Sequence, residues 1–252
     1  PLAVGPAMSA TGFSYGDVLV LIARLIADQQ GIETRVDAAT KALADADMPV
    51  AMAGMLDFCG DVLQFALPHG DPAQLTALLV EHFGDVDLLV ADHEIEVPRL
   101  FVSDMDSTMI GQECIDELAD FAGLKERVAA ITERAMRGEL DFADALTERV
   151  SLLEGLEETA IDRCLSERIV PVPGARTLVA TLAENGCRTV LVTGGFHHFA
   201  DPVAERLGFE RVVGNRLAVH DGKLTGELAG PISDASTKLA TLKEERGQLG
   251  EG

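Results

Sequence analysis

The chain has 252 residues, of which 47% are hydrophobic, so it can bury a full core, and its length favours one large domain with a small one attached. Its 42 Asp and Glu residues outnumber 20 Lys and Arg, giving a formal net charge of -22 that argues against nucleic acid or an anionic membrane as the main partner. The four cysteines lie far apart without a Cys-x-x-Cys spacing, which indicates neither a zinc site nor a disulfide framework and favours the reducing cytoplasm.

The N-terminal third predicts a leader followed by a small domain. Residues 1–17 are rich in small residues and are interpreted as a disordered leader. The apolar run that follows is interrupted by Arg24 and is too short to cross a membrane. Residues 18–96 then read as strand, helix, two strands, helix and strand, the βαββαβ order of a ferredoxin-like domain. The expected elements are Val18–Ala27, Thr34–Asp45 with Thr34 as N-cap, Gly54–Leu67 as two strands about a turn at Cys59-Gly60-Asp61, Asp71–Phe83 and Val86–Ile95.

A short apolar run, Leu100 to Val102, predicts a buried strand, and Asp104 and Asp106 lie just beyond its carboxyl end. Ligands of open parallel α/β sheets bind outside the carboxyl ends of the strands, so both carboxylates are expected in that crevice. Repulsion between like charges would raise the pKa of one carboxyl and leave the other ionised as a nucleophile or metal ligand. The alternative is an aspartate-rich turn with Ser107 as a helix N-cap.

Residues 112–171 change to a helical pattern, which predicts a helical insert lying over that crevice as a cap that excludes water. Arg149 falls on an apolar stripe with Phe142, so it either snorkels at the cap's edge or faces the crevice, where its guanidinium can grip a carboxylate. Glu113 stands where the first cap helix begins, and its negative charge interacts favourably with the dipole of that helix. Met136 and Phe142 either shield the pocket or belong to the cap core.

The remaining sequence predicts a return to the sheet. A strand over Cys187–Val192 ends on Thr193-Gly194-Gly195, either a simple strand-to-helix turn or a loop whose N–H groups hold a phosphate oxygen at the start of a helix. Lys238 lies in the first turn of a later helix, where the dipole disfavours a cation, so it either has a compensating anion or is solvated. The other expected elements are a helix over Ala175–Leu182, a helix ending at Leu207, a strand Arg211–Val213, a hairpin Leu217–Leu228 turning at Asp221-Gly222, and a last helix capped by Ser233 or Asp234 with Leu239 and Leu242 inward.

The stretch Asp104-Met105-Asp106-Ser107-Thr108, with Glu113-Cys114-Ile115-Asp116-Glu117-Leu118 after it, resembles the first motif of the phosphoserine phosphatase family in the haloacid dehalogenase superfamily. The resemblance runs from about Arg99 to the end. Further matches follow in family order: Ile131 to Met136, Arg149 to Leu153, Thr193 to Phe196, Asn215 to Leu217, Asp221 to Gly226 and Asp234 to Lys238. The family more often has Ser at position 193, and Thr keeps the hydroxyl.

This resemblance implies an α/β fold, a Rossmann-like haloacid dehalogenase core over residues 97–252 with the helical cap inserted at about 112–171, after a small ACT-type ferredoxin-like domain. It also implies Mg²⁺-dependent hydrolysis of O-phospho-L-serine through an aspartyl-phosphate, the last step of serine biosynthesis. The roles it implies are Asp104 as nucleophile and metal ligand, Asp106 as general acid and base and metal ligand, Glu113 for the substrate ammonium, Arg149 for its carboxylate, and Thr193, Gly194, Gly195 and Lys238 for the phosphoryl group.

The family's last motif, Gly-Asp-Gly-x-Asn-Asp, is not found before the chain stops at Gly252. We expect a fragment of a longer reading frame rather than a catalytically defective protein. Two alternatives stay open: a phosphatase of the same superfamily acting on another small ester, or an amino-acid-binding regulatory protein with a defunct catalytic domain. A homodimer through the N-terminal domain is a further expectation; the sequence leaves that domain's ligand and the divalent ion used in the cell open.

Overall fold

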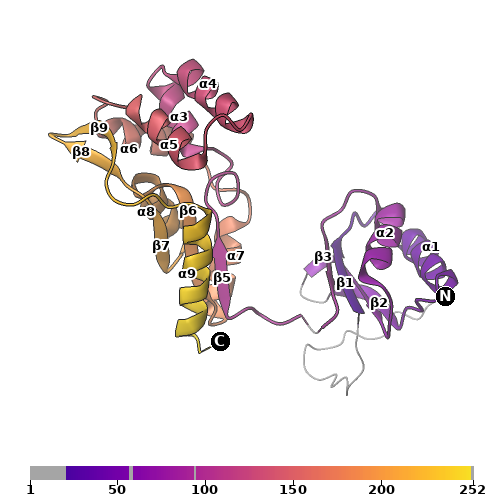
Figure 1. The fold of residues 1–252 in the computed structure, drawn as a ribbon. Helices are drawn as coiled ribbons and strands as arrows, with labels where there is room; N and C mark the ends of the chain where they lie inside the picture. Colours follow the sequence, from indigo (N-terminus) through magenta and orange to yellow (C-terminus); the bar gives the residue numbers. More distant parts are fainter. Residues whose placement is uncertain (1–20, 57–58, 94, 251–252) are drawn as a thin grey trace. The chain divides into compact units, whose positions relative to one another are not determined.

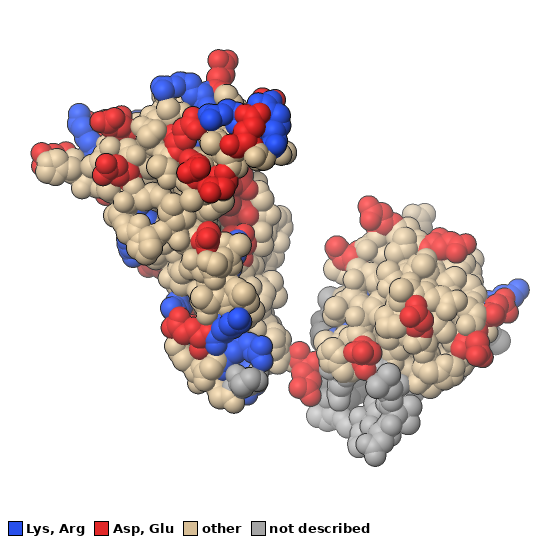
Figure 2. Space-filling model, in the orientation of Figure 1, with Lys and Arg blue, Asp and Glu red and all other residues tan. Residues whose placement is uncertain are grey.

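The computed structural model describes residues 21–56, 59–93 and 95–250, and the chain divides into two compact units at Glu96 and Val97 (Figure 1). The predicted leader and the start of the predicted strand Val18–Ala27 lie outside the described residues. Within the described part of the chain, no helix is long and apolar enough to cross a membrane. Figure 2 shows acidic side chains spread over the visible surface of both units, with fewer basic ones among them.

The first unit has the predicted βαββαβ order and a four-stranded antiparallel sheet with strand order β2-β3-β1-β4. Its elements are β1 Leu21–Ile26, α1 Ile32–Asp45, β2 Met52–Leu56, β3 Cys59–Leu67, α2 Pro72–Phe83 and β4 Leu88–Ala91. Alternate residues of the central strands, such as Leu25 and Phe65, are buried against apolar residues of both helices, such as Leu43 and Leu79. This fold is the ferredoxin-like arrangement that the sequence predicted.

Two details of the first unit differ from the prediction. Helix α1 begins after Gly31, whose φ of 68° is readily adopted by glycine, so Thr34 is not its N-cap. The predicted turn at Cys59-Gly60-Asp61 is wrong, because β3 starts at Cys59, which already pairs with Leu56. The connection consists of residues 57 and 58, outside the described part.

The sheet of the second unit is parallel, in the order β5-β6-β7, and is formed by β5 Leu100–Ser103, β6 Arg188–Phe196 and β7 Arg211–Asn215. The other elements of this part are α7 Ala175–Glu184, α8 His197–Leu207, the hairpin strands β8 Leu217–His220 and β9 Lys223–Leu228, and α9 Ala235–Gln248. The predicted hairpin turn is confirmed: Asp221 and Gly222 have φ values of 50° and 73°, as a two-residue turn with positive φ at both positions requires.

The predicted helical insert consists of α3 Cys114–Phe121, α4 Lys125–Met136, α5 Phe142–Ser151 and α6 Thr159–Arg168. Its two connections to the sheet lie side by side, because Ile110 and Pro171 form an antiparallel bridge. The Val172 amide also donates to the Met109 carbonyl at 3.0 Å. The insert therefore leaves and re-enters the sheet at one place.

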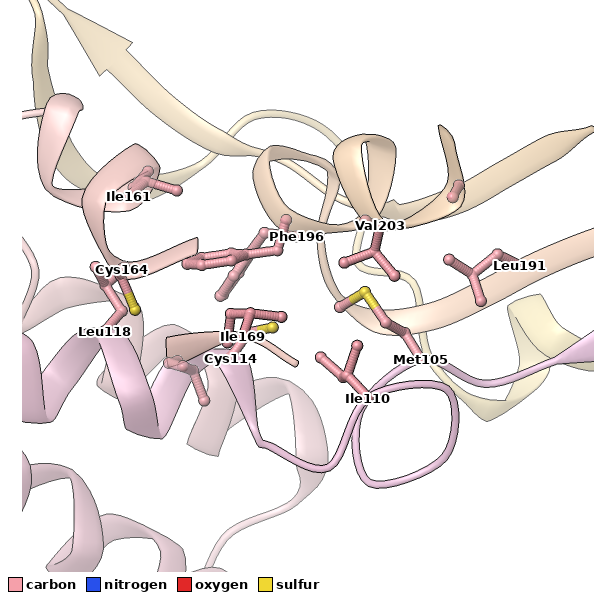
Figure 3. Packing of buried hydrophobic residues seen from close by; sticks show 14 of the residues in the cluster. Met105, Ile110, Cys114, Leu118, Ile161, Cys164, Ile169, Leu191, Phe196 and Val203 are labelled. Atoms are coloured by element: carbon pink, nitrogen blue, oxygen red, sulfur yellow. The ribbon is translucent and has the colours of Figure 1, made fainter. Parts of the chain in front are cut away.

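One continuous apolar core joins this insert to the sheet (Figure 3). Leu118 and Cys164 point into it from the cap, and Leu191 and Phe196 from β6. Met105, which separates the two aspartates, is fully buried in the same cluster. Burying Met105 anchors the turn after β5, so Asp104 and Asp106 start from a fixed backbone.

Helix α9 is held to the sheet by a buried charge. The Glu245 side chain is 1% exposed and accepts from Arg188 Nε at 3.1 Å and from Arg211. Burial acts to raise the pKa of Glu245, but the two guanidinium groups outweigh it and the pKa is lowered. The carboxylate therefore stays ionised between β6, β7 and α9.

The prediction that Leu239 and Leu242 face inward is wrong. Their exposures are 52% and 37%, and they line a groove of about 370 Å³ beside β5, together with Val102 and Val192. The physical reason is that β5 is at the edge of the sheet in the described part of the chain, so no further strand covers this face of α9.

Candidate active site

All the residues predicted as site residues line one pocket of about 190 Å³ at the carboxyl ends of the parallel strands. They come from five places: the segment after β5, the start of α3, the last turn of α5, the end of β6 and the first turn of α9. The residues are Asp104, Asp106, Glu113, Arg149, Thr193, Gly194, Gly195 and Lys238. The fold thus brings together carboxylates, two cations and two glycines that are separated by up to 134 positions in the sequence.

Asp104 and Lys238 form a close ion pair at the floor of this pocket. The other carboxylate oxygen of Asp104 accepts from the Met105 amide at 2.9 Å. Lys238 is presented by α9, whose N-cap Asp234 accepts the Ser236 amide at 2.9 Å. Of the two alternatives for this lysine, a compensating anion or solvation, the structure shows an anion, the Asp104 carboxylate. The phosphoryl group, which the resemblance implies as the anion, stays a prediction.

Asp106 is held by two neighbouring elements. The Cys114 amide donates to one carboxylate oxygen at 2.9 Å, and the Thr193 hydroxyl donates to the other at 3.3 Å. The pKa of Asp106 is raised, mainly because burial disfavours the charged form, with the nearby Asp104 charge adding to it and these hydrogen bonds opposing it. The sequence predicted a raised pKa from charge repulsion, whereas burial is the larger cause.

Thr193, Gly194 and Gly195 are not a loop after the strand, as predicted, but part of β6. The pairing of β6 with β7 shifts register between Val192 and Phe196, so these three residues bulge out of the ladder. Within the bulge, the Gly195 amide donates to the Thr193 hydroxyl oxygen at 2.9 Å. The bulge turns the segment toward Asp106.

Both glycines have close neighbours that leave little room for a side chain. A Cβ on Gly195 would lie 2.6 Å from a carboxylate oxygen of Asp106, and one on Gly194 would lie 3.0 Å from the Phe142 ring. Phe142 lines the pocket, which agrees with its predicted shielding role. Met136, the last residue of α4, neither lines the pocket nor belongs to the cap core, since it is 84% exposed.

Glu113 and Arg149 line the cap side of the pocket. The Ser107 hydroxyl donates to a Glu113 carboxylate oxygen at 2.7 Å and so fixes this side chain. Ser107 itself has a φ of 50° and does not cap a helix. The pKa of Glu113 is raised by burial and, less, by the charges of Asp106, Asp116 and Asp104.

Arg149 Nε donates to the Ala145 carbonyl at 3.3 Å, and Arg149 forms no ion pair with any described residue. Arg149 is among the residues that line the pocket, as the crevice-facing alternative requires.

Two residues given no catalytic or binding role from the sequence support this pocket from behind. Asn215, at the end of β7, and Ser233, next to the N-cap, bind the carbonyls of the β6 bulge. Ser233 was considered only as a helix cap, and the cap is Asp234. The available signal was position: Asn215 ends the third parallel strand, at the same sheet edge as Asp104 and Thr193.

The donor set suits a hard cation, although the described residues contain no group of three or more His, Cys, Asp or Glu side chains that could hold a metal ion. Asp104 and Asp106 offer oxygen atoms, and no histidine or cysteine is among the described lining residues. Mg²⁺ prefers oxygen ligands, is usually held by one or two carboxylates and keeps several waters. The residues present fit such an ion.

Comparison with known proteins identifies the family of this chain. Residues 101–252 match the family model of haloacid dehalogenase-like hydrolases. The phosphoserine phosphatase SerB2 of Mycobacterium tuberculosis is 42% identical over 192 residues, which are 75% of this chain and 47% of that protein. The phosphoserine phosphatase of Polaromonas sp. is 40% identical over 184 residues, 71% of this chain and 76% of that protein.

Among solved structures, a phospho-aspartyl intermediate analogue of phosphoserine phosphatase superposes with a TM-score of 0.57 at 36% identity, covering 62% of this chain and 75% of the other. The chain thus spans about half the length of the mycobacterial relative and three quarters of the Polaromonas one. The family model and the relatives assign the chain to a family by sequence, and the superposition agrees with this assignment by fold. The chain belongs to the haloacid dehalogenase-like hydrolases.

Proposed function

We propose that this protein hydrolyses O-phospho-L-serine to L-serine and phosphate, with Mg²⁺ as cofactor. The observation that carries the proposal is that one pocket holds two kinds of group: the Asp104, Asp106 and Lys238 cluster at the sheet, and the oppositely charged Glu113 and Arg149 on the cap side. Relatives named phosphoserine phosphatase support the substrate. A phosphate ester with an ammonium and a carboxylate matches both groups.

At the sheet end, Asp104 acts as the nucleophile. Its carboxylate attacks phosphorus in line with the serine oxygen, so the ester bond breaks as the aspartyl-phosphate forms, and water later hydrolyses that intermediate. The Lys238 ammonium, already beside Asp104, neutralises charge on the phosphoryl oxygens. Asp104 and Asp106, together with water, would hold a bound Mg²⁺, which would supply further positive charge for these oxygens. The Thr193–Gly195 bulge binds the remaining phosphoryl oxygens through its hydroxyl and amides.

Asp106 acts as the general acid and then as the general base. A raised pKa favours its protonated form, so it can donate a proton to the leaving serine oxygen. Once ionised, it takes a proton from the water that attacks the aspartyl-phosphate, which restores the starting state. Its bond to the Cys114 amide keeps the carboxyl oriented through both steps.

At the cap end, Glu113 and Arg149 bind the amino-acid part of the substrate. The Glu113 carboxylate binds the substrate ammonium, and the Arg149 guanidinium binds the substrate carboxylate in bidentate fashion. Arg149 has no competing ion pair in the described part of the chain, so its charge is available to a ligand. The proposal extends to a cytoplasmic location and to dimer formation through the N-terminal unit.

The decisive experiment follows the phosphoenzyme. The product of the complete reading frame that contains this sequence is mixed with Mg²⁺ and phosphoserine, quenched in acid and assayed for protein-bound phosphate and released phosphate. Asp104→Asn should form no phosphoenzyme and lose turnover, while the wild-type protein shows both. Turnover near wild type in Asp104→Asn would refute the nucleophile, and a wild-type protein that prefers other esters would refute the substrate.

A further inference from the structure

The bulge in β6 takes backbone carbonyls out of the hydrogen-bonded ladder with β7. Because the ladder shifts register between Val192 and Phe196, the carbonyls of Thr193 and Gly194 find partners in side chains. Asn215 Nδ2 donates to the Gly194 carbonyl at 2.7 Å, and the Ser233 hydroxyl donates to the Thr193 carbonyl at 3.2 Å. The conformation of the phosphate-facing segment thus depends on two side chains behind it.

Asn215 also holds the segment that leads into α9. Its Oδ1 accepts the Ser233 amide at 2.7 Å, and its Nδ2 lies 3.3 Å from the Ser233 carbonyl. Ser233 immediately precedes the N-cap, and Lys238 follows in the first turn. One amide group therefore connects the bulge to the helix that presents the lysine, using both its donor and its acceptor.

Asn215 is 1% exposed and is not among the residues that line the pocket. Burying an amide is costly unless it is fully hydrogen-bonded, and here the bonds go only to the two segments that meet the phosphoryl group. A closely packed neighbour supports the same point: a Cβ on Gly214 would lie 3.1 Å from the Gly195 carbonyl. The end of β7 is shaped to the back of the bulge.

We propose that Asn215 is a positioning residue for phosphoryl transfer, which sets the Thr193–Gly195 bulge and the Lys238 helix in register without touching the substrate. The inference rests on the proposed function and adds a residue to it. A purely structural Asn215 would affect only the free energy of unfolding. A positioning Asn215 must also affect the chemical step in folded protein.

The test uses Asn215→Asp, in which protonation of the new side chain restores what the amide does. A protonated carboxyl has one O–H donor for Gly194 and one acceptor for Ser233, whereas the ionised form has no donor and repels the Gly194 carbonyl. Burial should raise the pKa of this carboxyl into the assay range. The ratio of variant to wild-type kcat should therefore fall as pH rises from 5 to 9, by about 10²-fold, the loss expected when groups that contact the substrate are misplaced by about 1 Å. Asn215→Ala should be impaired across this range.

A matched control separates activity from stability. Thr189 lies at the other end of β6, fully buried, and its hydroxyl oxygen accepts the Glu210 amide at 3.2 Å. Thr189→Val should lower the melting temperature and leave kcat and its pH profile unchanged. If the Asn215 variants lower the melting temperature in the same way while kcat stays at the wild-type value across the pH range, the inference is overturned.

Binding of inorganic phosphate to the same proteins distinguishes failure of the inference from failure of the proposed function. Asn215→Ala should bind phosphate at least tenfold more weakly than wild type and Thr189→Val, because both phosphate-facing segments are displaced. If the wild type hydrolyses no ester yet shows this difference in phosphate binding, the proposed function fails and the positioning role stands. Equal phosphate affinities in wild type and Asn215→Ala would overturn the positioning role.

Discussion

Gly195→Ala tests directly whether the proposed site depends on the placement of Asp106. The added Cβ would lie 2.6 Å from a carboxylate oxygen of Asp106, against at least 3.4 Å for ordinary contact, so the carboxyl or the β6 bulge must move by about 0.8 Å. The Cβ would also lie 3.1 Å from Met105 and 3.2 Å from the Thr193 hydroxyl oxygen, which leaves little room for adjustment. A displacement of this size at reacting groups costs about 10²-fold in rate.

We therefore expect kcat for phosphoserine to fall about 100-fold, with a loss of about 1–3 kcal/mol in the free energy of unfolding from overpacking. Steady-state phosphate release and urea unfolding measure the two effects. The matched control is Gly247→Ala, in the last turn of α9, where no atom lies within 4 Å of an added Cβ. It should keep full activity and lose no stability, with a gain of at most about 0.5–1 kcal/mol. Activity of Gly195→Ala within twofold of wild type would refute the steric reasoning.

Three further predictions follow. Arg149→Lys should weaken kcat/KM for phosphoserine at least tenfold more than for an aryl phosphate, because lysine cannot grip a carboxylate in bidentate fashion; equal losses would indicate a structural role. Glu245→Ala should cost about 2–3 kcal/mol in urea unfolding, below the value for a fully buried pair because Arg188 and Arg211 are partly exposed, and a loss under about 0.5 kcal/mol would contradict it. The raised pKa of Asp106 means that this group's contribution to stability is fully present below the unfolded carboxyl pKa of about 3.9 and is lost as pH rises through the folded pKa. Asp106→Asn should therefore be more stable than wild type at neutral pH, with the difference vanishing toward pH 3; a pH-independent difference would exclude this linkage.

Local patterns predicted the parts of this molecule that local physics determines. The apolar run ending on Asp104 predicted β5 and its crevice, and the Asp221-Gly222 pair predicted the hairpin turn, because both depend on adjacent residues. The clustering of the predicted site residues in one pocket followed from strand ends sharing one sheet edge, while their individual roles stay predictions.

The parts that the sequence did not predict depend on distant partners. Helical periodicity placed Leu239 and Leu242 on one face of α9 but did not indicate what covers that face. The bulge at Thr193–Gly195 depends on the register with β7, and Asn215 binds residues 21 and 18 positions away. Likewise, the burial of Glu245 is decided by arginines on two strands. Hydrogen bonds of this range leave no periodic signature in the chain.

The bridge between Ile110 and Pro171 has a consequence for how such a fold can diversify. Because the two ends of the insert are bridged to each other, the residues between them can be replaced by another insert without displacing the strands on either side. Here the proposed nucleophile stands before the junction and the lysine after it, whereas the arginine that would distinguish one ester from another lies inside. Under the proposed function, the residues for the reaction and those for ligand preference thus lie in separate stretches of polypeptide, and grafting a different insert at this junction would alter the second while leaving the first in place.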